Sequence, residues 1–175
     1  MKIFLLSLAL GLLGLAPAPA QDKPLKVVDH VDLERYLGTW YEIATIPQRF
    51  QKGCVAVTAT YSLKPDGKIQ VINRCRKETL DGKVRDIEGK AWVVDKTTNA
   101  KLKVQFFWPF SGAYWIIELD ADYRWAVVGH PNRNYLWILS RTPQLDQALY
   151  DDLLGRIGDK GYDIARIKRT LQPGE

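Results

Sequence analysis

Hydrophobic and polar residues alternate with a period of two along most of the chain between Trp40 and Leu139. Such alternation is typical of β-strands that bury one face and expose the other. Turn-forming stretches such as Lys64-Pro65-Asp66-Gly67 interrupt it repeatedly. The pattern predicts eight strands, which are Gly38 to Ile46, Cys54 to Leu63, Lys68 to Arg76, Asp86 to Val94, Lys101 to Phe107, Tyr114 to Leu119, Trp125 to Gly129, and Tyr135 to Ser140.

After the eighth strand the period lengthens to one apolar residue in every four, which predicts a helix with a single apolar stripe. Thr142 is placed to cap this helix, and Pro143 suits its first turn. We expect the stripe to pack against the outside of the sheet, and a short last strand, Ile164 to Thr170, to add to a sheet edge. The stripe consists of Leu145, Leu149, Leu153 and Ile157.

The short links between the eight strands predict an antiparallel meander. An open meander leaves two unpaired edges, whereas closing it removes the edges and encloses room for one small ligand. The predicted fold is therefore all-β: an eight-stranded antiparallel up-and-down β-barrel, with one C-terminal helix outside and a short ninth strand.

Residues 1–20 have the pattern of a secretion signal, with a positive start at Met1-Lys2, an apolar run and small residues at Ala18-Pro19-Ala20. The apolar run is too short to span a bilayer. We expect one mature domain, residues 21–175, located in the periplasm. The first cysteine after the run is Cys54, which lies too late to carry a lipid anchor at the cleavage point.

The formal net charge of +5 becomes +4 without Lys2. This mild excess permits attraction to anionic lipid, but it lacks the dense basic stripe of a nucleic-acid-binding protein. Two cysteines in an oxidising compartment allow one disulfide. Cys54 and Cys75 are expected on neighbouring strands. Simple alternation points them to opposite faces, so this disulfide requires a bulge in one strand.

Three stretches of the chain resemble the bacterial and apolipoprotein-D-like branch of the lipocalin family: Tyr36 to Ala44, Val57 to Leu63, and Tyr135 to Pro143. The resemblance covers essentially the whole mature chain. It implies the barrel fold called the lipocalin calyx and the binding of a small hydrophobic ligand.

The three structural motifs of that family have counterparts here, in Gly38-x-Trp40, in Asp120-Ala121-Asp122-Tyr123 and in Arg141. The second motif carries Ala121 where the family usually has Thr. Counting strand ends in a meander places all three motifs at one end of the barrel. We expect them to close the barrel rather than to catalyse, with the Arg141 guanidinium lying across the Trp40 indole. The predicted barrel-closing residues are Gly38, Trp40, Asp122, Tyr123 and Arg141.

The opposite end is then the mouth, formed by Ile46 to Gly53, Lys77 to Arg85, Trp108 to Gly112, and Pro131 to Asn134. Its loops carry cations and aromatic residues. One interpretation is a basic rim for anionic headgroups with an aromatic lip for membrane or acyl chain, and the other is ordinary solvated loops. The residues concerned are Arg49, Lys52, Lys77, Lys83, Arg85, Arg133, Phe50, Trp108 and Phe110.

Alternation also assigns the interior of the barrel. Pairing across the Pro65-Asp66-Gly67 turn places Tyr61 opposite Val71, Ala59 opposite Asn73 and Val57 opposite Cys75. Trp137 is added because it matches a ligand-lining position in apolipoprotein-D-like relatives. The predicted wall is apolar and aromatic, and it suits a fatty acyl chain. The predicted ligand-binding residues are Val57, Ala59, Tyr61, Val71, Asn73, Val104, Phe106, Tyr114, Ile116 and Trp137.

Glu42 shares strand parity with Trp40 and is therefore expected to point inward, where a carboxylate requires a partner or is neutralised. Two roles remain open for it. It anchors the polar head of a ligand, or a nearby hydroxyl satisfies it, and the second is the preferred interpretation.

Catalytic signals are absent from the sequence. His30 and His130 cannot assemble a zinc cluster with the cysteines without using the predicted disulfide, and no nucleophile or phosphate-binding motif occurs. We therefore predict no enzyme activity, metal or cofactor. The leading hypothesis is a lipocalin of the periplasm or outer membrane that binds, stores or transports fatty acids or lysophospholipids, with peripheral membrane contact.

Three alternatives stay open at this point. The first is a lipocalin-fold enzyme that acts on a lipophilic substrate, with a free Cys75 as its nucleophile. The second is a carrier of a tetrapyrrole, carotenoid or sterol. The third is an interaction module whose barrel is filled by side chains. The sequence does not decide between a monomer and a homodimer.

Overall fold

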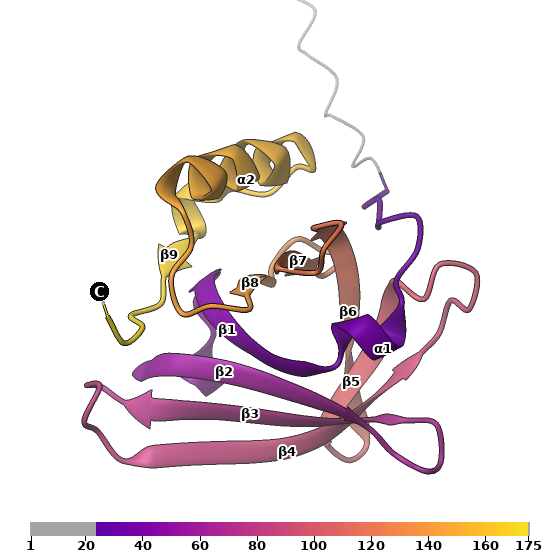
Figure 1. Cartoon of the computed structure of the whole chain (residues 1–175), viewed down its shortest axis with the longest axis horizontal. Coiled ribbons are helices and arrows are strands. Elements are labelled where there is room, and N and C mark those ends of the chain that lie inside the picture. Colours follow the sequence, from indigo (N-terminus) through magenta and orange to yellow (C-terminus); the bar gives the residue numbers. More distant parts are fainter. Residues whose placement is uncertain (1–23, 175) are drawn as a thin grey trace, which may run out of the picture.

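The computed structural model describes residues 24–174, and the predicted signal segment lies outside the described residues. The described part is dominated by antiparallel strands (Figure 1). The strands are β1 (Gly38–Thr45), β2 (Cys54–Leu63), β3 (Ile69–Lys77), β4 (Val84–Val93), β5 (Lys101–Phe107), β6 (Phe110–Leu119), β7 (Trp125–Gly129), β8 (Leu136–Ser140) and β9 (Lys168–Arg169).

The strands form one sheet in the order β2-β3-β4-β5-β6-β7-β8-β1-β9, and β1 also pairs with β2. This extra pairing closes the sheet into a barrel of eight antiparallel strands, which confirms the predicted fold. The largest boundary difference is in β6, which begins at Phe110 rather than at Tyr114. Phe107 pairs with Phe110 across a tight hairpin, so the ladder extends further toward the mouth than alternation predicted.

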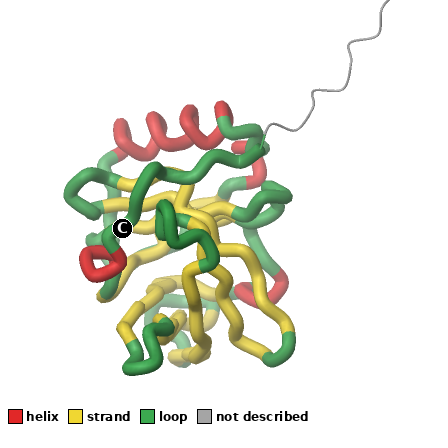
Figure 2. Tube along the Cα trace, turned by 90° about the vertical axis from the view of Figure 1, so that its right-hand side faces the viewer, coloured by secondary structure: helices red, strands yellow, loops and turns green. Residues whose placement is uncertain are grey.

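The barrel has two apolar clusters, one on each side of its wall. The inner cluster fills the lumen and includes Trp40, Tyr61 and Ile116. The outer cluster lies between the wall and α2 (Gln147–Asp159), where Leu153 and Ile157 are fully buried. Figures 1 and 2 show α2 outside the barrel, as the apolar stripe predicted.

The predicted start of α2 was wrong. Asp146, not Thr142, caps the helix, and its carboxylate accepts a hydrogen bond from the Leu149 amide. Thr142 is instead held against the end of β8, because its amide donates to the Ser140 hydroxyl and its own hydroxyl donates to the Gln144 carbonyl. Pro143 consequently lies in a loop before the helix.

The predicted last strand, Ile164 to Thr170, was too long. The Asp163 carboxylate accepts a hydrogen bond from the Ala165 amide and caps a 3₁₀ turn, η2 (Ile164–Arg166). Only β9 pairs as a strand, with Ala44 and Thr45 of β1.

The chain before β1 contains a helix that alternation did not predict, α1 (Leu33–Tyr36). The Asp32 carboxylate caps this helix by accepting hydrogen bonds from the amides of Glu34 and Arg35. A single turn is too short to show a helical period in the sequence. This turn brings Leu33, Tyr36 and Leu37 against the lumen cluster.

The wall has a seam between β1 and β2 near the mouth. The two strands pair only over Gly38 to Tyr41, and beyond that point the C-terminal segment lies between them. The Ile43 carbonyl accepts a hydrogen bond from the Thr170 amide, and the Ala56 amide donates to the Leu171 carbonyl. The Gln172 side-chain amide donates to the carbonyls of Glu42 (2.8 Å) and Val57 (3.0 Å), so it bridges both strands.

A bulge in β2 permits the disulfide. Pairing with β3 shifts register between Val55 and Thr58, and Ala56 has a left-handed φ of 48°. The extra residue reverses the alternation of β2 before it, so Cys54 lies on the same face as Cys75. The two cysteines are bonded at the mouth end of the β2–β3 hairpin. The predicted disulfide and its bulge are confirmed. The expected pairing of Val57 with Cys75 does not occur as a regular rung, because it lies inside the bulge.

Candidate functional site

The floor of the barrel is closed by Arg141. Its guanidinium lies 3.7 Å above the centre of the Trp40 ring, and it donates to the carbonyls of Thr39 (2.9 Å) and Arg35 (2.8 Å) and, through Nε, to that of Tyr123 (3.3 Å). Trp40 is fully buried. One side chain therefore joins α1, β1 and the β6–β7 turn.

Gly38 has a structural reason to be glycine. Its φ of +91° is a left-handed conformation that other residues rarely adopt, and a Cβ atom there would lie 3.4 Å from Arg141 Nη1. A side chain at this position would strain the backbone and lie in ordinary contact with the guanidinium. The glycine of Gly38-x-Trp40 thus serves the same closure as the tryptophan.

The turn between β6 and β7 is organised by Asp120. Its buried carboxylate accepts hydrogen bonds from the amides of Asp122 and Arg124 and pairs with the Arg124 guanidinium at 2.7 Å, which lowers its pKa. Asp122, the predicted closing residue, is exposed, so the structure places the organising carboxylate two positions earlier. The Tyr123 hydroxyl accepts a hydrogen bond from the Asp32 amide at 2.7 Å and ties this turn to α1.

The predicted ligand-binding residues are distributed along the lumen from floor to mouth. Tyr61, Val71 and Ile116 belong to the buried lumen cluster. Five others are half-buried against it, and these are Ala59, Val104, Phe106, Tyr114 and Trp137.

Two predicted residues differ from that apolar set. Val57 is buried at the bulge, and its carbonyl serves the seam. Asn73 is half-buried opposite Ala59, and its Oδ1 atom is buried with no hydrogen-bond partner among the described residues. A polar atom in this position is suited to a water molecule or to the polar group of a ligand.

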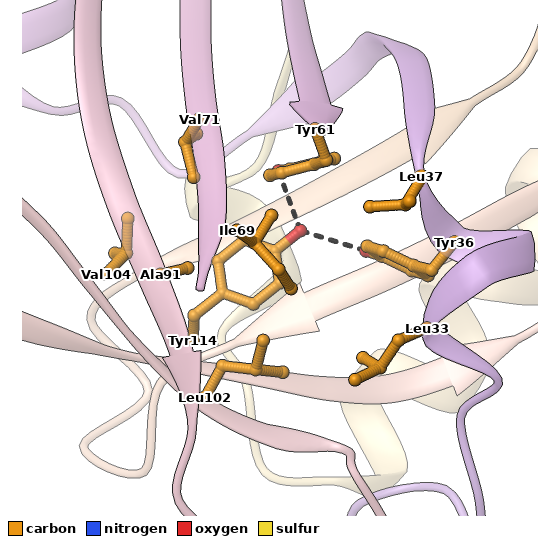
Figure 3. A pocket seen from close by; sticks show the side chains of 10 residues that line it. All are labelled: Leu33, Tyr36, Leu37, Tyr61, Ile69, Val71, Ala91, Leu102, Val104 and Tyr114. Atoms are coloured by element: carbon orange, nitrogen blue, oxygen red, sulfur yellow. Dashed lines mark hydrogen bonds between the residues drawn. The ribbon is translucent and has the colours of Figure 1, made fainter. Parts of the chain in front are cut away.

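The deep end of the lumen contains an apolar pocket of about 10 Å³ (Figure 3). Three of its lining residues, Leu33, Tyr36 and Leu37, come from α1 and the residue after it, and alternation gave no signal for them. Ile69 was also missed, although it lies two residues from Val71 on the same strand face. The remaining lining residues are Tyr61, Val71, Ala91, Leu102, Val104 and Tyr114.

Three tyrosine hydroxyls meet at this pocket. The Tyr114 hydroxyl lies 2.9 Å from that of Tyr36 and 2.9 Å from that of Tyr61 (Figure 3). Burial raises the pKa of Tyr61 to about 12 and those of Tyr36 and Tyr114 well above the usual value. All three phenols therefore remain neutral at physiological pH.

Glu42 is buried, and its carboxylate accepts a hydrogen bond from a hydroxyl, as the preferred interpretation predicted. Its carboxylate accepts hydrogen bonds from the Thr170 hydroxyl (2.5 Å) and from the side-chain amide of Gln51 (2.6 Å). Burial raises the pKa of Glu42, and these two donors partly oppose that effect. Gln51 in turn accepts a hydrogen bond from the Trp137 indole at 3.3 Å, so the network reaches the lumen.

The mouth presents large aromatic side chains to solvent. Trp108 and Phe110 at the β5–β6 hairpin are 85% and 77% exposed. Phe50 in the turn after β1 and Phe107 at the end of β5 are also exposed. Arg49, the first residue of η1 (Arg49–Gln51), is exposed as well. The other exposed cations of these loops are Lys52, Lys83 and Arg85.

Two of the predicted rim cations have partners on the loops themselves. Lys77 donates to the Lys52 carbonyl at 2.7 Å, and Arg133 donates to the carbonyls of Lys160 and Pro131. These two side chains hold the mouth loops in place. The exposed cations are therefore fewer than the sequence predicted.

Cys75 is bonded to Cys54, so it is not the free nucleophile that the enzyme alternative requires. Residues 24–174 contain no group of three or more His, Cys, Asp and Glu side chains able to hold a metal ion. Among the same residues, no helix has the length and apolar character needed to cross a membrane.

The chain is similar to known proteins over nearly its whole length. The family model of the lipocalin-like domain matches residues 31–172. Temperature-induced lipocalin-1 of Arabidopsis thaliana is 44% identical over 87% of this chain and 85% of its own. Outer membrane lipoprotein Blc of Escherichia coli is 44% identical, covering 90% and 88%, and apolipoprotein D of Macaca fascicularis is 36% identical, covering 98% and 95%.

A solved structure supports the fold independently. Insecticyanin from the tobacco hornworm Manduca sexta superposes with a TM-score of 0.70 over 90% of this chain and 89% of its own, at 20% identity. At that identity the likeness shows the barrel and not the ligand. Together with the family match and the relatives above 30% identity, it leads to one conclusion: the chain belongs to the lipocalin family.

Proposed function

We propose that this lipocalin binds a fatty acid or lysophospholipid in its barrel and stores or carries it in the bacterial envelope. The observation that carries the proposal is the apolar wall of the lumen, where inward-facing side chains keep partial exposure toward the mouth. The half-buried residues on that side include Phe106 and Trp137. Each methylene that leaves water there contributes about 0.8 kcal/mol to binding.

Most of the acyl chain has to occupy the half of the lumen nearer the mouth, so that only its tip reaches the deep end. The pocket at the deep end has a volume of about 10 Å³, enough for about one water-sized group. A ligand therefore lies between Asn73, Phe106 and Trp137, and its headgroup emerges among the exposed cations of the mouth loops. Arg49 and Lys52 are suited to an anionic headgroup.

The aromatic lip, defined as Phe50, Phe107, Trp108 and Phe110, gives the mouth a second role in this proposal. Exposed aromatic and basic side chains together favour the interface of an anionic membrane. The lip would hold the mouth against the lipid surface from which the ligand enters. The periplasm is the proposed location, on the signal-like pattern of residues 1–20, and outer-membrane lipoproteins among the relatives fit an envelope role.

The binding site is tested by filling the lumen. Ala59 is half-buried between Trp40 of β1 and Asn73 of β3, so Ala59→Phe places a ring where the ligand is proposed to lie. We expect it to weaken binding of a fluorescent fatty acid by about tenfold or more, roughly the effect of excluding a few methylenes. Thr60→Phe, at the next position of the same strand and on the opposite face, is the matched control.

If Ala59→Phe and the wild-type protein bind the fluorescent fatty acid with equal affinity, the ligand does not lie at this place in the lumen, and the proposed binding site is wrong. Displacement of the fluorescent probe then identifies the ligand class. Fatty acids and lysophospholipids are expected to compete, and competition by neither, with competition by a sterol or tetrapyrrole, would replace this proposal with the carrier alternative.

A further inference from the structure

Three hydroxyl groups from distant parts of the chain meet at the deep end of the lumen. Tyr36 comes from α1, Tyr61 from β2 and Tyr114 from β6, and Figure 3 shows the Tyr114 oxygen between the other two rings. Both distances from the Tyr114 hydroxyl are 2.9 Å. We call these three residues the tyrosine triad.

The triad has one more donor than it has bonds. Each neutral phenol carries one hydroxyl hydrogen, so three hydrogens are available, while two hydrogen bonds join the three oxygens. Whichever way the two bonds are directed, one hydrogen remains without a partner inside the triad. Depending on which hydroxyl donates in each bond, this hydrogen belongs to Tyr36, Tyr61 or Tyr114.

No other side chain that lines the pocket offers that hydrogen an acceptor. The other seven residues that line the pocket are all aliphatic, and they are Leu33, Leu37, Ile69, Val71, Ala91, Leu102 and Val104. Arg141, the charged group behind Trp40, has only donors.

The size of the pocket limits what can meet this hydrogen. About 10 Å³ admits roughly one water-sized group, so a whole headgroup is excluded and a single oxygen atom fits. Buried donors in proteins nearly always have an acceptor, either on the protein or on a bound molecule. An oxygen atom at the buried end of a ligand has both the size and the chemistry required.

We propose that the tyrosine triad is a binding site for one oxygen acceptor, and that the barrel therefore selects amphiphiles that carry a ketone, hydroxyl or similar oxygen at the end remote from the headgroup. This inference rests on the proposed function, because it assumes that a hydrophobic chain enters through the mouth. The apolar pocket wall shapes the site, and the triad supplies its single polar contact. Oxygenated acyl chains and oxygenated ring lipids share this chemistry.

The test compares paired ligands by displacement of a fluorescent fatty acid from the full-length protein. Each pair consists of a fatty acid with a ketone next to its terminal methyl group and the unsubstituted acid of the same length, over several chain lengths. A ketone oxygen accepts but does not donate, so it reports on the unassigned hydroxyl hydrogen. We expect the ketone acid to bind about fivefold more tightly than its partner at the length that reaches the triad.

The variant Tyr36→Phe/Tyr61→Phe/Tyr114→Phe removes all three donors while keeping the ring volumes. It is expected to bind the unsubstituted acid as well as the wild-type protein does and to lose the preference for the ketone. Tyr162→Phe is the matched control, since Tyr162 is a buried tyrosine outside the lumen whose hydroxyl bonds to the backbone of His130. The control should keep the wild-type preference.

The outcomes separate this inference from the function beneath it. A wild-type protein that binds both acids equally, or prefers the unsubstituted acid at every length, overturns the acceptor site and leaves lipid binding intact. The same holds if the triple variant keeps the preference, which would assign it to Asn73 instead. If neither acid displaces the fluorescent fatty acid, the proposed function itself is contradicted. The wild-type ranking decides the question even if the triple variant does not fold.

Discussion

The floor and the mouth of the barrel are built from the same strands but in opposite ways. At the floor, Trp40 is fully buried and Arg141 is tied to three carbonyl groups across α1, β1 and the β6–β7 turn. At the mouth, Trp108 and Phe110 face solvent on a hairpin. The contrast indicates that the floor is fixed by buried contacts, while the aromatic hairpin at the mouth is exposed to ligands and surfaces.

The largest expected effect is a loss of stability when the contacts at the floor are removed. Arg141→Ala removes three hydrogen bonds to carbonyl groups and the cation–π contact with Trp40, and it leaves those carbonyls without this donor. We expect the free energy of unfolding to fall by about 3 kcal/mol, measured by urea denaturation. Arg74→Ala is the control, because its ion pair with Asp86 is exposed and contributes less than about 1 kcal/mol.

Similar losses in these two variants would mean that Arg141 is an ordinary surface cation. The barrel would then be closed by strand pairing alone, and the contrast between floor and mouth would lose its basis.

The second prediction concerns the mouth, where a change should weaken membrane binding and leave the free energy of unfolding almost unchanged. Trp108→Ser/Phe110→Ser removes two exposed aromatic rings from the aromatic lip and is expected to weaken binding to anionic vesicles about tenfold. The free energy of unfolding should change by less than about 0.5 kcal/mol per exposed site. Vesicle cosedimentation and urea denaturation measure the two quantities.

The control for this prediction lies at the opposite end. Leu63 ends β2 and Val94 follows the end of β4, and both are exposed apolar residues at the floor end of the barrel. Leu63→Ser/Val94→Ser therefore removes apolar surface where no membrane contact is proposed. Vesicle binding that falls equally in both double variants would show nonspecific adhesion and would remove the lip from the proposal.

The smallest expected effect concerns Glu42, whose network joins the C-terminal segment to the mouth. Burial raises its pKa above the value in the unfolded chain, so the folded state binds the proton more tightly. Its contribution to stability is full below the unfolded pKa and is lost as the pH rises through the folded pKa. The wild-type protein should therefore gain stability relative to Glu42→Gln as the pH falls from neutral.

Urea denaturation at a series of pH values measures this difference. Glu88→Gln, an exposed position on β4, controls for the change from carboxyl to amide. A difference between wild type and Glu42→Gln that stays constant with pH would contradict the assignment.

Strand pattern predicted most of the barrel, because alternation is a local property that each strand carries in its own sequence. Features that depend on distant partners were harder to predict. The direction of Glu42 followed from parity, but its acceptor role depends on Thr170, which lies 128 positions later. The bulge at Ala56 was required by the disulfide and was not visible in the alternation itself.

The candidate site shows the same limit. Tyr61 and Tyr114 lie in alternating strands and were predicted to line the lumen, whereas Tyr36 lies in a one-turn helix with no period to detect. The triad therefore became visible only when the three elements were placed in space. The cap of α2 was missed for a different reason, since Thr142 and Asp146 are both good caps and β8 had already engaged the first of them.

The seam between β1 and β2 sets an order for assembly of the protein. Gln172 bridges the two strands across separations of 130 and 115 positions, so the first hairpin of the barrel is completed by residues that leave the ribosome much later. Contacts of such long range are slow to form because the intervening chain has to be ordered first. Until they form, the wall stays open beside Glu42 and Val57, and the unpaired strand edges there are exposed.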